Sequence, residues 1–136
     1  MTLAGGCLCG GVRYEVTGAL RPVIACHCRQ CRRWSGNFVA ATQAQTADLV
    51  LTQAETLAWY RSSDKAERGF CARCGGNLFW RPAGGARTSI MAGTLDPPTG
   101  LRIAQHIFVA DKSDFYGIGD AAPQHAHWPP GETPEE

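Results

Sequence analysis

The chain has 136 residues, enough for one domain with a thin hydrophobic core. Its 13 Lys and Arg against 12 Asp and Glu leave a net charge of +1, which excludes a strongly basic nucleic-acid footprint. No stretch approaches the length of a membrane span, and residues 1–20 lack the apolar run of a signal peptide. We therefore expect a cytoplasmic protein with neither nucleic-acid nor membrane partners.

Short runs of β-forming residues recur along the chain and are separated by Gly and Pro. The first run, Val12–Val16, alternates apolar and polar side chains, as a half-buried strand does. A short helical turn is predicted over Arg29–Ser35, ended by Gly36. Further strands are predicted at 23–25, 38–42, 49–52, 57–61, 66–70, 77–81, 88–92 and 104–109. The expected fold is all-β, with sandwiched or tent-like antiparallel sheets.

Composition changes once along the chain, near Gly119. Residues 3–118 carry the strand pattern and are predicted to form a single β domain. Residues 119–136 contain four prolines and few core-type residues, and three acids lie near the end. Such a segment is expected to be an extended or disordered tail.

Cysteine spacing is the most informative feature of the sequence. The seven cysteines form three clusters: Cys7-x-Cys9, Cys26-x-Cys28-x-x-Cys31 and Cys71-x-x-Cys74. In a reducing compartment such spacings indicate metal ligands or catalytic groups rather than disulfides, and an odd count also fits disulfides poorly. The glycines that follow Cys74 allow the tight turn of a zinc knuckle, which aims two sulfurs at one point.

Two groupings of the cysteines are compatible with zinc. In the first, Cys7 and Cys9 join Cys71 and Cys74 in a four-thiolate site, and the triad of Cys26, Cys28 and Cys31 stands alone. In the second, the triad supplies ligands to the knuckle and the N-terminal pair is left over. We favour the first, because three thiolates within six residues can hold one metal by themselves. It predicts two zinc ions per chain. The alternative is one site with spare thiols, such as a buried, inert cysteine in the triad.

Four stretches of the chain resemble the glutathione-dependent formaldehyde-activating enzyme family, which includes the centromere protein V-like proteins. They are GCLCGGVRY at 6–14, CHCRQCRR at 26–33, WYRSS at 59–63 and RGFCARCG at 68–75. The resemblance runs from about Leu3 to Tyr116 and implies a β-tent fold. It also implies a structural zinc on Cys7, Cys9, Cys71 and Cys74 and a catalytic zinc on the triad. The implied activity is that of a carbon–sulfur lyase acting on two small molecules, a thiol and an aldehyde, as in the formation of S-hydroxymethylglutathione.

The residues around the triad suggest how such chemistry would proceed. Three thiolates on zinc leave an open position, where a substrate thiol could bind as thiolate and attack an aldehyde carbon. His27 is the nearest candidate to protonate the resulting alkoxide, although a supporting role beside the ligands is favoured for it. Arg29, Arg32 and Arg33 could bind substrate carboxylates or merely offset the charge of the thiolates.

Other residues and functions carry weaker expectations. His106 is expected to pack within a strand, and His125 and His127 to bind metal adventitiously at most. One rival function is a non-enzymatic zinc-stabilised binding module, in which the triad is a second structural site. Another is a thiol-redox or metal-storage protein, whose triad would oxidise reversibly and release zinc.

Overall fold

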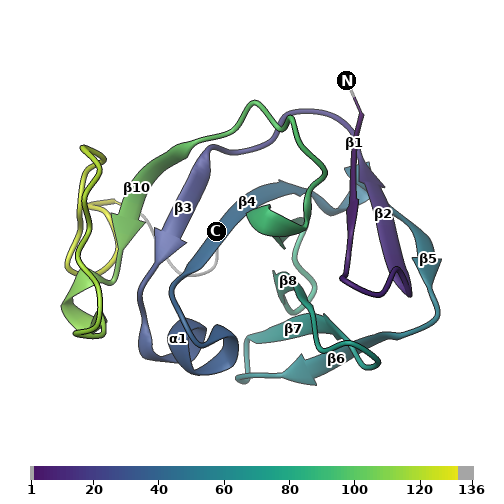
Figure 1. Ribbon diagram of the computed structural model, residues 1–136, viewed down its shortest axis with the longest axis horizontal. Helices are drawn as coiled ribbons and strands as arrows, with labels where there is room; N and C mark the ends of the chain where they lie inside the picture. Colours follow the sequence, from purple (N-terminus) through teal and green to yellow (C-terminus); the bar gives the residue numbers. More distant parts are fainter. Residues whose placement is uncertain (1, 132–136) are drawn as a thin grey trace. The chain divides into compact units, whose positions relative to one another are not determined.

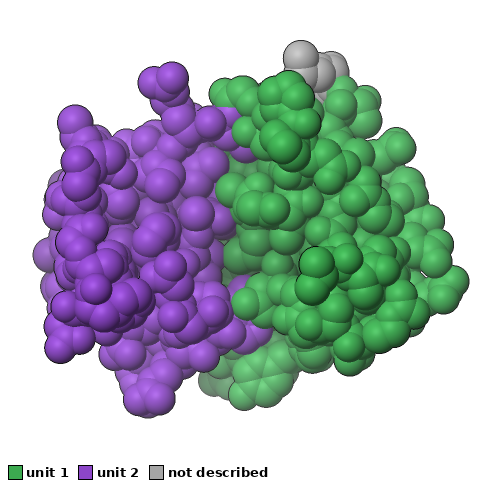
Figure 2. Space-filling view, in the orientation of Figure 1, with its two compact units in different colours: residues 1–21, 42–100 green, residues 22–41, 101–136 purple. Residues whose placement is uncertain are grey.

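The computed structural model describes residues 2–131. The chain is built mainly of strands (Figure 1), so the all-β prediction is confirmed. Two compact units divide the chain: unit 1 takes the residues up to Arg21 and Thr42–Gly100, and unit 2 takes Pro22–Ala41 and the residues from Leu101 onward (Figure 2). No helix among the described residues is long and apolar enough to cross a membrane.

Unit 1 contains a three-stranded antiparallel sheet of β1 (Leu3–Gly6), β2 (Val12–Val16) and β5 (Leu49–Ala54), with β2 in the middle. The alternation in β2 has the predicted consequence, because Val12, Tyr14 and Val16 are buried while Glu15 is exposed. Strand β1 was not predicted, since the sequence LAGG has little β-forming character of its own. It is held by its pairing to β2, in which Leu3 lies opposite Val16.

A second antiparallel sheet of unit 1 has the strand order β9–β8–β7–β6. Its strands are β6 (Leu57–Arg61), β7 (Ala66–Cys71), β8 (Asn77–Pro82) and β9 (Arg87–Met91), and β4 (Val39–Gln45) joins it next to β9 from Thr42 onward. The 3-10 turns η1 (Thr46–Asp48) and η2 (Ala92–Thr94) follow β4 and β9. Tyr14 of the first sheet packs edge-on against Phe79 of β8, with ring centroids 5.3 Å apart. The Tyr14 hydroxyl is also 2.7 Å from that of Thr94, so one buried side chain ties the two sheets of unit 1 together.

Unit 2 is organised around β3 (Val23–Cys26). The N-terminal part of β4 pairs with β3 in antiparallel orientation, and β10 (Ile103–Ile107) pairs with its other side. The β3–β10 pair is parallel, which differs from the antiparallel prediction. A parallel pair needs a long crossover between its strands, and here the chain makes all of unit 1 from Thr42 to Gly100 before β10 begins.

The predicted helical turn is confirmed as α1 (Arg29–Ser35), which begins after β3. Gly36 ends the helix with φ 81°, in the left-handed region that glycine adopts without strain. Its N–H donates to the carbonyl of Arg32 at 2.8 Å. This short helix places residues 28–31 directly beyond the end of β3.

The last described segment of unit 2, residues 119–131, runs beside β10 and the 3-10 turn η3 (Val109–Asp111). The N–H of His106 donates to Pro123 and the N–H of His125 donates to His106, each at 2.9 Å. The ring of Phe108 meets those of His127 and Trp128 at 6.1 and 5.4 Å. These contacts hold residues 119–131 against β10, whereas residues 132–136 of the predicted tail lie outside the described residues.

Candidate metal centres

The cysteine sulfurs gather in two groups that could each hold a metal ion. One group is Cys7, Cys9, Cys71 and Cys74 in unit 1, and the other is the triad of Cys26, Cys28 and Cys31 in unit 2. Within each group all Sγ atoms lie within 4.8 Å of one another. The two groups have the same members as the favoured grouping of the sequence analysis.

Two glycine-containing turns build the four-cysteine group. In the first, the N–H of Cys7 donates to Val12 at 3.1 Å, and that of Gly10 donates to Cys7 at 3.3 Å. In the second, the N–H of Cys71 donates to Gly76 at 2.9 Å. Gly10 and Gly75 have φ values of 81° and 78°, in the left-handed region. Each turn thereby folds back so that its two sulfurs face the same point.

The distances in the four-cysteine group fit a tetrahedral metal. Sγ of Cys9 lies 3.7 Å from that of Cys7 and 3.6 Å from that of Cys71. A metal–sulfur bond of roughly 2.3 Å gives a tetrahedron with an edge of about 3.8 Å between sulfurs. A disulfide would need about 2.05 Å, and none of the seven cysteines forms one.

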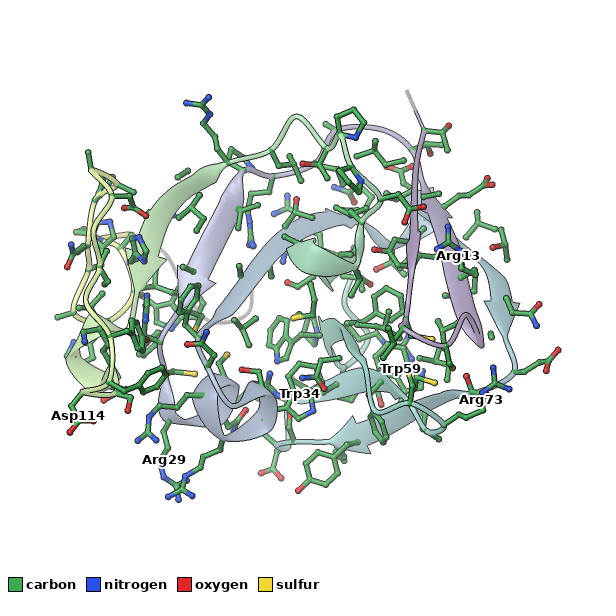
Figure 3. All side chains as sticks on the ribbon, in the orientation of Figure 1. Arg13, Arg29, Trp34, Trp59, Arg73 and Asp114 are labelled. Atoms are coloured by element: carbon green, nitrogen blue, oxygen red, sulfur yellow. The ribbon has the colours of Figure 1, made fainter. Side chains whose placement is uncertain are left out.

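Neighbouring donors prepare the four-cysteine group for negative charge. The Thr56 hydroxyl, 3.0 Å from Sγ of Cys71, is the main cause of a pKa lowered to about 5 for that thiol. The N–H of Gly11 and the guanidinium of Arg73 lower the pKa of Cys9, and Arg73 Nε lies 3.3 Å from its sulfur (Figure 3). Burial raises the pKa of Cys7 in the same cluster. Four thiolates this close together require a cation between them, so the donor set fits a metal ion.

Local structure also explains how the triad forms. Cys26 is the last residue of β3, and Cys28 is the N-cap of α1. Sγ of Cys28 accepts the N–H of Cys31 at 3.3 Å, so one helical turn brings the two side chains together. Hydrogen bonding to Cys28 and Cys31, followed by burial, raises the pKa of Cys26. Three thiols that oppose one another's ionisation in this way become a ligand set when a cation offsets their charge.

His27 lies between two triad residues in the chain but is engaged elsewhere. Its side chain is buried, with Nε2 2.9 Å from Nδ1 of His106 and Nδ1 hydrogen-bonded to the hydroxyl of Tyr116. The ring of Phe38 packs on both His27 and Tyr116, at centroid distances of 5.0 and 5.6 Å. Burial, followed by the charges of His106 and Lys112, lowers the pKa of His27.

His106 extends this arrangement towards the C-terminal segment. It is buried in β10, as a packing residue would be, and its Nε2 lies 3.0 Å from both carboxylate oxygens of Asp120. The hydrogen bonds from His106 and from the N–H of Ala122 lower the pKa of Asp120. Tyr116 and Asp120 were not predicted as site residues. They lie 89 and 14 positions from their partners, and no spacing pattern links them to the triad.

The three arginines occupy one face of α1, because positions 29, 32 and 33 follow helical spacing. Arg29 and Arg33 are exposed, and Figure 3 shows Arg29 extending outward from the helix. Arg32 is half-buried, and its Nε donates to the carbonyl of Asp111 at 3.3 Å. Cys31 lies on the opposite side of the helix by the same spacing. Because it contacts Asp111, Arg32 is the arginine of the three that lies nearest to the segment after β10.

Comparison with known proteins identifies the family of the chain. Residues 2–111 match the family described as glutathione-dependent formaldehyde-activating enzyme. The chain belongs to this family. An uncharacterized lyase of Schizosaccharomyces pombe is 29% identical over 118 residues, which cover 85% of each protein. A crystal structure of a Rhodobacter sphaeroides protein is similar with a TM-score of 0.59 and 27% identity, covering 71% of this chain and 91% of that one.

The match to the glutathione-dependent formaldehyde-activating enzyme family ends at residue 111. It includes both cysteine groups, His27 and His106. Tyr116 and Asp120, which complete the contacts of these histidines, lie beyond it. The surroundings of His27 therefore combine residues inside and outside the family match.

Proposed function

We propose that the chain is a zinc-dependent carbon–sulfur lyase that forms and cleaves an aldehyde–thiol adduct of the S-hydroxymethylglutathione type. The observation that carries the proposal is the difference between the two cysteine groups. One offers four protein ligands, the number that closes a structural zinc site. The triad offers three, and no further His, Cys, Asp or Glu among residues 2–131 joins it. Three protein ligands are typical of catalytic zinc.

The chemistry of the donors supports zinc as the metal in both groups. Thiolate sulfur is a soft ligand that zinc accepts readily, and neither group contains a carboxylate. Zinc held by Cys26, Cys28 and Cys31 would lower the pKa of a thiol that reaches it. Ligation needs reduced cysteines, which fits the lack of disulfides among the seven and the cytoplasmic setting expected from the sequence.

The residues around the triad have separate proposed roles. Arg32, with Arg29 and Arg33 on the same face of α1, would attract the carboxylates of a glutathione-like thiol. His27 would act through the hydrogen bonds of its ring rather than as a free proton donor, because both ring nitrogens are already engaged. Phe38 and Tyr116, packed on that ring, would keep it fixed beside the triad.

The reaction of formaldehyde with glutathione to form the adduct, and its reversal, test the function directly. The adduct forms spontaneously, so the rate of exchange at equilibrium is measured by ¹³C exchange spectroscopy with and without the zinc-loaded protein. Catalysis is expected to raise that rate in proportion to protein concentration. A rate equal to that without protein, for glutathione and for small thiols alike, would favour the binding-module interpretation.

The arginine face predicts how the protein chooses its thiol. Arg32→Ala is expected to raise the KM for glutathione about ten- to a hundredfold, because a hydrogen bond to a charged group contributes roughly 1.5–3 kcal/mol. The KM for 2-mercaptoethanol, which has no carboxylate, should change little. Steady-state rates with the two thiols measure the difference. Arg61→Ala in unit 1 is the control, since Arg61 is exposed and its Nη2 donates to the nearby carbonyl of Asp64 at 3.2 Å. Equal losses with both thiols would reduce Arg32 to a solvated charge.

A further inference from the structure

Four side chains of unit 2 form one continuous row of hydrogen bonds, which we term the Asp120–Tyr116 row. Asp120 contacts Nε2 of His106, Nδ1 of His106 contacts Nε2 of His27, and Nδ1 of His27 contacts the Tyr116 hydroxyl. The two histidines are buried, at 3% and 1% exposed. Packing alone would not require polar rings to be joined end to end in this order.

The carboxylate determines which atom donates and which accepts at each hydrogen bond of the row; we call this order the direction of the row. An ionised carboxylate can only accept hydrogen bonds, and both Asp120 oxygens lie 3.0 Å from Nε2 of His106. A neutral His106 then carries its proton on Nε2, which leaves its Nδ1 as an acceptor. His27 then donates from Nε2 and accepts at Nδ1, so the Tyr116 hydroxyl donates to His27.

The Tyr116 end of the row is linked to the triad through His27. His27 is flanked in the chain by Cys26 and Cys28, and its ring stacks on that of Tyr116 with centroids 5.6 Å apart. Lys112 holds the segment that carries Tyr116, since its Nζ donates to the carbonyls of Ser113 and Tyr116 and lies 4.6 Å from the Tyr116 ring. Because the hydroxyl proton of Tyr116 is committed to His27, its oxygen can meet another molecule only as an acceptor.

We propose that Asp120 is a positioning residue, which acts through His106 and His27 to make the Tyr116 oxygen a hydrogen-bond acceptor for the substrate. Its partner would be the substrate group that bears a proton, the S–H of the thiol or the O–H of the hydroxymethyl adduct. This inference rests on the proposed function of the triad. The contrasting possibility is that the row merely ties the C-terminal segment to β10, in which case its direction has no consequence.

The variant Asp120→Asn separates these possibilities because it changes the direction while keeping the shape. Oδ1 of Asp120 also accepts the N–H of Ala122 at 3.0 Å. An asparagine oxygen can keep that bond, which turns the amide NH₂ towards Nε2 of His106. The row then runs the other way: His106 and His27 both carry their protons on Nδ1, and the Tyr116 oxygen accepts from His27.

Nuclear magnetic resonance of the zinc-loaded, ¹⁵N-labelled protein measures the direction directly, through long-range proton–nitrogen correlations of the two imidazoles. We expect Nε2–H on both rings in the wild type and Nδ1–H on both in Asp120→Asn. Asp114→Asn, which removes a nearby exposed charge outside the row (Figure 3), should keep the wild-type pattern. A wild-type His27 protonated on Nδ1, or the same pattern in Asp120→Asn as in the wild type, would overturn the proposal.

Turnover of the same proteins tests the consequence. Asp120→Asn is expected to lower kcat for adduct exchange about tenfold with little change in the KM for the thiol, and Asp114→Asn to change neither. Tyr116→Phe should lose a similar factor, since it removes the accepting oxygen. Normal kcat with reversed tautomers would reject the role of Asp120. Absence of turnover in the wild type would instead reject the proposed function. The tautomers of His27 and His106 are measured independently by NMR, so their assignment would not change.

Discussion

Replacing Cys74 by Ser is expected to leave little soluble, folded protein. The four-cysteine group joins segments distant in the chain, since Cys9 and Cys71 are 62 positions apart and their sulfurs 3.6 Å apart. Structural zinc contributes roughly 10–16 kcal/mol of apparent binding energy in small peptides. The whole margin of a domain's stability is about 5–15 kcal/mol. Loss of one ligand therefore removes most of what holds the two turns of unit 1 together.

The soluble fraction and the circular-dichroism melting curve measure this effect. Cys7→Ser, Cys9→Ser and Cys71→Ser should behave like Cys74→Ser. Leu8→Ser is a matched control, because Leu8 lies between two of the ligands and is 93% exposed. It should melt like the wild type. A cooperative transition of Cys74→Ser within a few degrees of the wild type would show that unit 1 does not depend on this group.

Cys28→Ser is expected to have the opposite outcome, with adduct turnover abolished and a cooperative thermal transition retained. The triad lies within six residues of chain, so closing it constrains little chain entropy. Serine at position 28 can also keep the N-cap bond to the N–H of Cys31, because its hydroxyl is a good helix cap. The substitution therefore removes a soft metal ligand without removing the start of α1.

Exchange rates and melting curves of Cys28→Ser and Cys31→Ser separate catalysis from folding. The Cys74→Ser protein gives the reference for the loss of a structural ligand. If the triad variants unfold to the same extent, the triad is a second structural site and the chain is better described as a zinc-stabilised binding module. If they fold and keep full turnover, the reaction takes place elsewhere.

The strand positions followed from local patterns, and their pairing did not. Val12–Val16 alternates so regularly that its buried face could be predicted, and Gly36 ends α1 because a left-handed cap favours glycine. β1 depends on β2 for its structure, so its own residues gave no signal. The parallel partner of β3 begins at Ile103, after the whole of unit 1, and no local pattern encodes such a contact.

The metal groups were predictable for a similar reason. Within each of the three sequence clusters the ligands are close together, and glycine turns and the helix cap aim their sulfurs through local geometry. That the two outer clusters share one metal was inferred from the number of ligands, since the triad can hold a metal by itself. The partners of His27 are different, because His106 and Tyr116 lie 79 and 89 positions away. Their approach depends on the pairing of β10 with β3 and on the chain that follows β10, where no element was predicted between residues 109 and 119.

Metal analysis tests most directly the central claim that the seven cysteines form two metal sites. Protein prepared with ample zinc is freed of loosely bound metal, and zinc is counted against folded chain by mass spectrometry. Two zinc ions per wild-type chain are expected, and one per folded chain of Cys28→Ser. One ion per folded wild-type chain would contradict the account, because one of the two cysteine groups would then hold no metal. If Cys28→Ser kept that single ion, the triad would be the empty group and could not be the reaction centre.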